Sequence, residues 1–390
     1  MSIKGYAELP LHEGHVPRWL AELMKKLARG IVEIIVLEYG PSELVRRLSS
    51  PLWFQAFNNI IGMDWDSSGS TTVTMGILRQ VLGEGDLGVL IVGGKGKMML
   101  RVPEELPQAV EKLGISNSRI EELVTASRLS AKIDSSLLQD GYKLYHHAVI
   151  VSEDGLWGVI QQGMNVDEKL ARRYHWLSSE IRDFVVEPHY GIASNRKATA
   201  LNLIARDAED ARKVIVDLAK ENPRKTSRLI AEASRIIRGD QSILNWLYDR
   251  ELSASIIGYD KRLKIIYYRP VRLTKKLLRT LNTLYESQPR NMRELLLVRG
   301  VGPETIRALA LVSDLIYREP PSWTDPVTDP IDPFRYAYAF GGKDGIPYPI
   351  KRKAMREAIE FLKEAVEKAR IGDKERIRAL KRLRRLLEGL

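Results

Sequence analysis

The residues best suited to chemistry gather in one stretch of the chain, residues 132–165. In chain order the candidates are Asp134, Asp140, His146, His147, Gln161 and Gln162. Hydrolysis of a phosphodiester uses a divalent cation, held by carboxylate or imidazole groups, to neutralise charge and activate water. We expect Asp134, Asp140 and His147 to hold Mg²⁺ or Mn²⁺, with a histidine as ligand or general base and the glutamines as positioning groups. The alternative is a hydrogen-bonded network that only stabilises the fold.

A β-hairpin is the element expected to position these groups. Residues 145–152 and 156–163 are rich in β-branched and aromatic side chains, and Gly155 between them can adopt a positive φ. Successive side chains of a strand point to opposite faces, so one of the two adjacent histidines must point away from the other.

A second polar segment, residues 62–72, opens a helix expected over residues 71–82. Its hydroxyls and free backbone N–H groups could bind a phosphate, and Asp64 and Asp66 could hold a divalent cation. The alternative is that its Ser and Thr residues only cap the helix.

Other elements follow from hydrophobic spacing. We expect helices over residues 17–39 and 103–128, and a strand over residues 87–92. A Gly-Lys turn should join that strand to a second one over residues 98–102. No Ser or Thr follows the lysine and no helix follows the turn, so this is not a nucleotide-binding P-loop.

Composition limits the class of protein. The chain has 390 residues, 44% of them hydrophobic, and no cysteine. Disulfides, thiolate nucleophiles and Cys-ligated metals are therefore excluded, and any metal must bind His, Asp or Glu. No apolar run has the length of a membrane span, so we expect a cytoplasmic protein without a membrane partner. The missing thiols and 28% charged residues suggest a thermophilic source.

Charge is distributed unequally along the chain. Residues 1–195 contain 20 Lys and Arg against 24 Asp and Glu, a net charge of −4, which leaves 41 against 26, or +15, for residues 196–390. All six histidines lie in the acidic half. This division predicts chemistry in the first half and a polyanion, DNA of unspecified strandedness, bound by the second.

Residues 292–317 carry the feature that points to DNA. A short helix ends in Arg299-Gly-Val-Gly, and a second helix begins at Pro303. This resembles the helix-hairpin-helix motif, whose glycine turn exposes backbone N–H groups that grip a DNA phosphate without reading sequence. The glycines are expected to supply positive φ and close approach. The candidate DNA-binding residues are Arg299, Gly300, Val301, Gly302, Thr305 and Lys343.

These patterns predict an α+β chain. A mixed α/β domain with β-hairpins, residues 1–195, should precede an all-α domain with the helix-hairpin-helix, residues 196–350. Residues 351–390 should form basic C-terminal helices, the last over residues 374–387.

Four motifs give the chain a family resemblance: LPLHEGHVPRWL, GMDWDSSGSTT, LQDGYKLYHHAVIV and FGGKDGIPYP. Together they resemble a family of archaeal and thermophilic bacterial proteins known as domain of unknown function 763. The resemblance covers nearly the whole length and implies no catalytic residues.

The function expected from these observations is a metal-dependent DNA nuclease in DNA repair or processing, with a repair protein as a candidate partner. The alternative is a non-catalytic DNA-binding protein that recruits another enzyme. A third interpretation is a helix-hairpin-helix glycosylase or lyase, because those enzymes carry an Asp about one helix after the glycine turn, where Asp325 lies. The oligomeric state is not predicted.

Overall fold

The computed structural model describes residues 16–63, 69–194, 197, 199–238, 270–328 and 349–368. At its centre is a five-stranded antiparallel sheet in the order β1-β3-β4-β5-β6. The strands are β1 (Val89–Lys95), β3 (Lys143–Ser152), β4 (Trp157–Asn165), β5 (Leu170–Leu177) and β6 (Gly191–Ala193). Helices combined with an antiparallel sheet are the α+β class that the sequence predicts.

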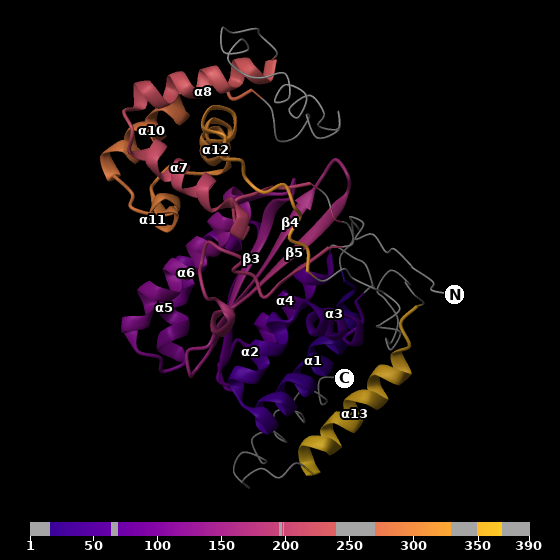
Figure 1. Cartoon of the computed structure of the whole chain (residues 1–390). Helices are drawn as coiled ribbons and strands as arrows, with labels where there is room; N and C mark the ends of the chain where they lie inside the picture. Colours follow the sequence, from indigo (N-terminus) through magenta and orange to yellow (C-terminus); the bar gives the residue numbers. More distant parts are fainter. Residues whose placement is uncertain are drawn as a thin grey trace.

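The first helices cover one face of the sheet. They are α1 (Arg18–Tyr39), α2 (Pro41–Ser49), α3 (Pro51–Ile60) and α4 (Gly69–Leu82), and α13 (Arg352–Lys368) packs beside α1 (Figure 1). Their apolar residues form one core with Ile91, Ala148, Ile150 and Ile160 from the strands. We call this side of the sheet the α4 face.

The other face of the sheet is covered by the first two of the later helices, and the rest pack against these two, the turn after them and one another. They are α5 (Val102–Lys112), α6 (Ile120–Lys132), α7 (Glu209–Lys220), α8 (Pro223–Arg238), α10 (Lys275–Ser287), α11 (Met292–Leu297) and α12 (Pro303–Tyr317). A second core joins Val149, Val159 and Trp176 of the strands to these helices. We call this side the α6 face.

The predicted hairpin is confirmed and is slightly longer than expected. β3 and β4 pair from Val151↔Trp157 to Lys143↔Met164, and Gly155 in the turn has φ +84°. The register shifts between Leu144 and His146, which leaves Tyr145 as a bulge residue.

Two expected elements are wrong. Residues 98–102 were expected to form a strand, but Gly96–Arg101 is a 3₁₀ helix. A Cβ at Gly93 would lie 2.4 Å from the His147 carbonyl oxygen, and Gly93, Gly94 and Gly96 all have positive φ, so the chain turns away from the sheet here. The single helix expected over residues 103–128 is instead the pair α5 and α6.

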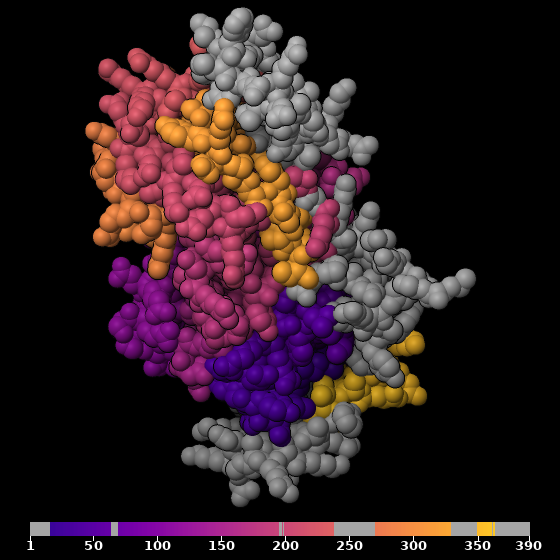
Figure 2. Space-filling view, in the orientation of Figure 1, coloured from indigo at the N-terminus to yellow at the C-terminus, as the bar shows by residue number. Residues whose placement is uncertain are grey.

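The two halves of the chain are connected by backbone pairing and by a common core. The short strands β2 (Leu138–Gln139) and β7 (Leu201–Asn202) pair, and Asn202 also bridges to Ser322 after α12. Figure 2 shows orange atoms, from α12 and the segment after it, lying against pink to magenta atoms on this face of the molecule. The core on the α6 face extends from Leu90 to Val327. The proposed division at residue 195 therefore crosses a continuous core, and it stays a prediction.

No helix among the described residues has the length and apolarity needed to cross a bilayer.

Candidate functional site

Strand register divides the predicted site residues between the two faces of the sheet. His147 lies opposite Gln161 and Gln161 opposite Tyr174, and these side chains share the α6 face. The neighbouring row, His146 opposite Gln162 opposite Arg173, points to the α4 face. The candidates therefore form two separate groups and not one.

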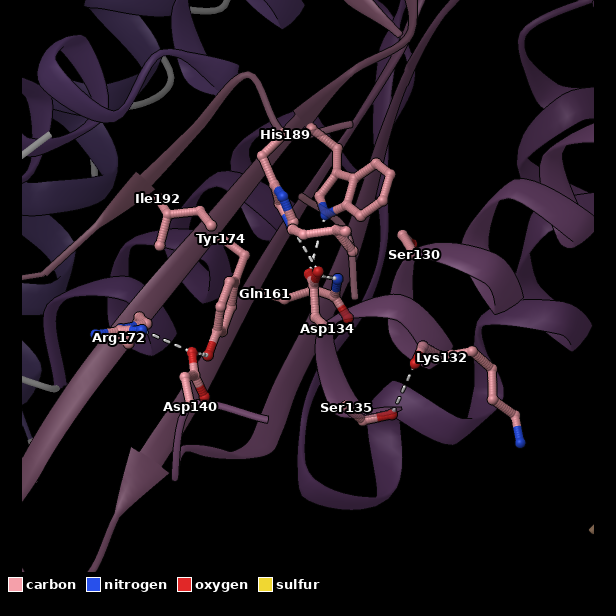
Figure 3. A network of polar contacts seen from close by, with 12 residues as sticks. Ser130, Lys132, Asp134, Ser135, Asp140, Gln161, Arg172, Tyr174, His189 and Ile192 are labelled. Carbon is pink, nitrogen blue, oxygen red and sulfur yellow. Dashed lines mark hydrogen bonds and ion pairs between the residues drawn. The ribbon is translucent and has the colours of Figure 1, made fainter. Parts of the chain in front are cut away.

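Asp134 is the centre of the group on the α6 face (Figure 3). It lies in a π-helical turn, Ile133–Leu137, that continues α6 and brings the carboxylate against β4 and β5. Its Oδ2 accepts hydrogen bonds from Gln161 Nε2 (2.5 Å) and Trp176 Nε1 (2.9 Å), and its Oδ1 lies 2.5 Å from His189 Nε2. Asp134 has no solvent exposure. Both oxygens are thus occupied by groups of the protein.

His147 joins the same network through Gln161. Gln161 donates its amide N–H to Asp134, so its Oε1 accepts from His147 Nδ1–H at 3.0 Å. His147 Nε2 then accepts from the Ser127 hydroxyl at 2.8 Å. Burial lowers the pKa of His147, while its contacts with Gln161 and Asp134 oppose the shift. The imidazole is therefore neutral, with its proton on Nδ1.

Asp140 belongs to an adjacent network around Arg172. Its Oδ1 accepts the Tyr142 backbone N–H (3.0 Å), and its Oδ2 accepts from Arg172 Nη1 (2.8 Å) and the Tyr174 hydroxyl (2.6 Å). Arg172 also forms a two-point ion pair with Asp325, at 3.0 and 2.7 Å. Burial alone would lower the pKa of Arg172, but Asp140, Tyr174 and Asp325 raise it. Arg172 stays charged and compensates both carboxylates.

The expected metal ligands are bonded to other groups of the protein, and metal binding by them stays a prediction. Asp134, His147 and Gln161 are brought together, and Asp140 lies in the adjacent network, but each carboxylate already accepts hydrogen bonds from protein donors. Within the described ranges, no group of three or more His, Asp or Glu side chains is arranged to hold a metal.

Several partners in these networks were missed. They are Ser127, Arg172, Tyr174, Trp176, His189 and Asp325. Residues 172–177 alternate polar and aromatic side chains, a strand signal that their arginines and histidine obscured. The sequence suggested Asp325 as a glycosylase residue. In the structure, Asp325 forms a buried ion pair with Arg172.

On the α4 face, His146 is buried, and neither ring nitrogen has a hydrogen-bond partner among the residues that the structure describes. Burial, His147 and Lys95 lower its pKa to about 3. Gln162 donates to the Tyr145 hydroxyl at 2.6 Å. These two residues share no hydrogen bond with the Asp134 network among those described.

The predicted DNA-binding turn connects α11 to α12. Gly300 has φ +95°, and a Cβ there would lie 2.9 Å from Thr280 Oγ1 of α10, so the fold itself requires this glycine. Gly302 differs from the expectation because its backbone is extended, with φ −162°. Its position faces open space, since a Cβ there would meet nothing within 4 Å.

The other predicted contacts at this turn differ in their exposure. Arg299 is exposed, whereas the side chains of Val301 and Thr305 are buried at 1% and 4% exposure, so only their backbone could meet a ligand. Lys343 and the loop residues Asp64 and Asp66 lie outside the described residues.

These observations define an α+β protein with closed polar networks around its sheet and a glycine turn on its helical side. The chain belongs to the family described as "Protein of unknown function (DUF763)", which matches residues 5–350. No curated protein and no solved structure matches the chain.

Proposed function

We propose that the chain is a DNA-binding protein that grips the phosphate backbone at the turn between α11 and α12. The observation that carries the proposal is the N-terminus of α12, where Gly302 is the N-cap and no side chain caps the helix. The first N–H groups of a helix have no partner within the helix, and together with the helix dipole they attract anions. Because Gly302 faces open space, a phosphate can approach this backbone.

Three cationic side chains lie around the turn, against one acidic residue, Glu304, in the first turn of α12. The ammonium group of Lys132 contacts the Val301 carbonyl oxygen, and burial and the nearby Lys276 lower its pKa. Arg299 is exposed in the turn itself. Gln139 also donates to the Pro303 carbonyl oxygen at 2.9 Å, which ties the turn to β2. The turn is thus held rigidly beside three cationic side chains, which favours phosphate binding.

A hollow near the other end of α11 adds to this positive surface. It has a volume of about 1010 Å³ and lies among α7, α11 and residues 182–186. Three acidic residues, Asp183, Glu209 and Asp217, line it. The basic residues of its lining are Arg182, Arg206, Arg212, Lys213, Lys220, Arg290 and Arg293. A basic hollow at the start of α11, one short helix away from the turn, suits a polyanion that extends beyond one phosphate.

The closed networks favour binding without catalysis over the metal-dependent nuclease that the sequence suggested. Asp134 and His147 are buried and hydrogen-bonded to protein groups, so a cation or a water molecule has no open access to them. DNA hydrolysis with Mg²⁺ or Mn²⁺ stays a prediction, and it would need different ligands or a rearranged network.

The test is incubation of the purified full chain with labelled single-stranded and duplex DNA at low salt, with Mg²⁺, Mn²⁺ or a chelator. We expect binding that weakens with salt and leaves the DNA intact in every case. Cleavage that a chelator abolishes would support the nuclease instead. Absence of binding to both DNA forms would overturn the proposal.

A further inference from the structure

The interface between the α4 face and helices α3 and α4 contains polar side chains that lack partners. They are Asn58, Asn59, Ser70, Thr74 and His146, each at most 1% exposed. Within the described part of the chain, these atoms have no hydrogen-bond partner: both polar atoms of the Asn58 amide, Asn59 Nδ2, the two hydroxyls and both His146 nitrogens. Buried polar groups in native proteins are nearly always satisfied, so such a concentration indicates a ligand that binds there.

Arg173 connects the helices to the sheet at this place. Its guanidinium donates to Thr71 Oγ1 of α4 and to Gln55 Oε1 of α3, each at 3.3 Å, and its Nε donates to His175 Nε2 at 2.8 Å. Gln55 in turn donates to Asn59 Oδ1 at 3.2 Å. The middle of α3 and the first turn of α4 are therefore both bonded to one cation.

α4 packs along β1, the edge strand of the sheet. Thr71 is bonded to Arg173 on β5, and Arg79 Nη1 donates to the Gly93 carbonyl oxygen on β1 at 2.6 Å. Thr74 lies between these two anchors on the same helix and is buried.

His146 projects to the same face from β3, in the row that continues to Arg173 through register with Gln162. His146 also pairs with Lys95 of β1, the strand along which α4 packs. This places the unpartnered groups of the helices and of the sheet in one region.

The chemistry of these groups is that of an anion site. The cluster contains amides, hydroxyls, a guanidinium and an imidazole, and none of its members is acidic. The imidazole of His146 is neutral, because burial lowers its pKa to about 3, and so it has one N–H to donate. Ser70 stands in the first turn of α4, a 14-residue helix whose N-terminal end carries a partial positive charge. Hydroxyl, amide and guanidinium donors at a helix N-terminus are the groups that hold a phosphoryl oxygen.

We propose that the cluster of Asn58, Asn59, Ser70, Thr74, His146 and Arg173 is a binding site for a phosphate group, separate from the turn before α12. The site lies in the N-terminal half of the chain, so it is independent of the DNA-binding proposal. A bound phosphate would form hydrogen bonds with these buried groups.

The experiment measures thermal unfolding of the full chain and isothermal titration with inorganic phosphate, against chloride at matched ionic strength. All variants carry Gly302→Val, which blocks the other anion site. Thr74→Val and Ser70→Ala remove unpartnered hydroxyls. Thr72→Val is the matched control, because the Thr72 hydroxyl donates to the Gly69 carbonyl oxygen on the same helix.

Phosphate should raise the melting temperature of the Gly302→Val protein. Thr74→Val should raise the melting temperature without phosphate, since an unsatisfied hydroxyl is removed, yet bind phosphate about tenfold more weakly. Ser70→Ala should weaken binding similarly, and Thr72→Val should leave it unchanged. No effect of phosphate on the Gly302→Val protein would overturn the proposal. Equal phosphate affinity in the Thr74, Ser70 and Thr72 variants would overturn it as well.

Discussion

At the scale of single residues, Asp134 shows how strongly the closed network depends on charge and on hydrogen-bond direction. Asp134→Asn keeps the shape of the side chain but turns one acceptor into a donor that faces the donors of Gln161, Trp176 or His189. We expect a loss of about 2–3 kcal/mol in the free energy of unfolding. DNA affinity should be unchanged, because the turn before α12 is not altered.

Urea unfolding measures the effect, with Asp167→Asn as control. Asp167 is exposed, so its variant should stay within about 0.5 kcal/mol of the original chain. An Asp134→Asn protein of unchanged stability that lost DNA cleavage would show that the carboxylate serves chemistry.

His146 gives a prediction about pH. Its pKa is about 3 in the folded chain, because of burial and the nearby His147 and Lys95, against about 6.5 in the unfolded chain. Between these values the unfolded state binds a proton that the native state does not, so its contribution to stability is complete above about pH 6.5 and is lost as the pH falls toward 3.

The urea midpoint of the original chain should therefore fall between pH 6.5 and pH 4, and less steeply in His146→Gln. The urea midpoint of the variant should still fall, because burial also lowers the pKa values of His147 and His175. Identical pH profiles for the two proteins would show that His146 is not held neutral in the fold.

The sequence identified much of the residue chemistry but not its geometry. Asp134, His147 and Gln161 were rightly grouped, since all lie on or just before one hairpin. Composition could not show that Trp176 and His189, far along the chain, occupy the oxygens of Asp134. The separation of His146 from His147 follows from the period of a strand, but which one enters the Asp134 network depends on register.

At the scale of elements, the ion pair between Arg172 and Asp325 ties the segment after α12 to the sheet. Both side chains are buried, at 0% and 3% exposure. Asp325→Asn leaves Arg172 with less compensating charge in a buried place, so we expect a loss of about 3–5 kcal/mol in the free energy of unfolding. Urea unfolding beside Asp167→Asn measures it. A loss no larger than the control's would mean that the pair does not connect the two halves.

Element prediction succeeded where the local signal was strong. The hairpin of β3 and β4 was recognised because alternation and a glycine turn agree. β5 was not assigned as a strand, because its buried Arg172, Arg173 and His175 disguise its alternation. The prediction of a strand over residues 98–102 was wrong because apolar residues there suggested burial. Met98 and Leu100 are instead exposed on a 3₁₀ helix.

At the scale of the whole molecule, residues 196–390 carry a net charge of +15. We expect this charge to promote DNA binding as part of the intact chain. The shared core on the α6 face means that the basic half is not packed as a separate unit. If Lys132, Lys276 and Arg299 each neutralise one phosphate, the logarithm of the DNA affinity should fall with the logarithm of salt with a slope of about −3. A slope near zero, measured by fluorescence anisotropy, would show that charge does not drive binding.

The most direct test of the account is the DNA affinity of Gly302→Val. The extended backbone and the open space at Gly302 allow a valine without strain, so the variant should unfold at the same urea concentration as the original chain. Its side chain would occupy the space through which a phosphate reaches the N–H groups of α12, so affinity should fall about tenfold or more. Glu304→Gln, at the exposed start of the same helix, is the control and should bind DNA more tightly because a negative charge is removed. Unchanged affinity in a folded Gly302→Val protein would contradict DNA binding at this turn.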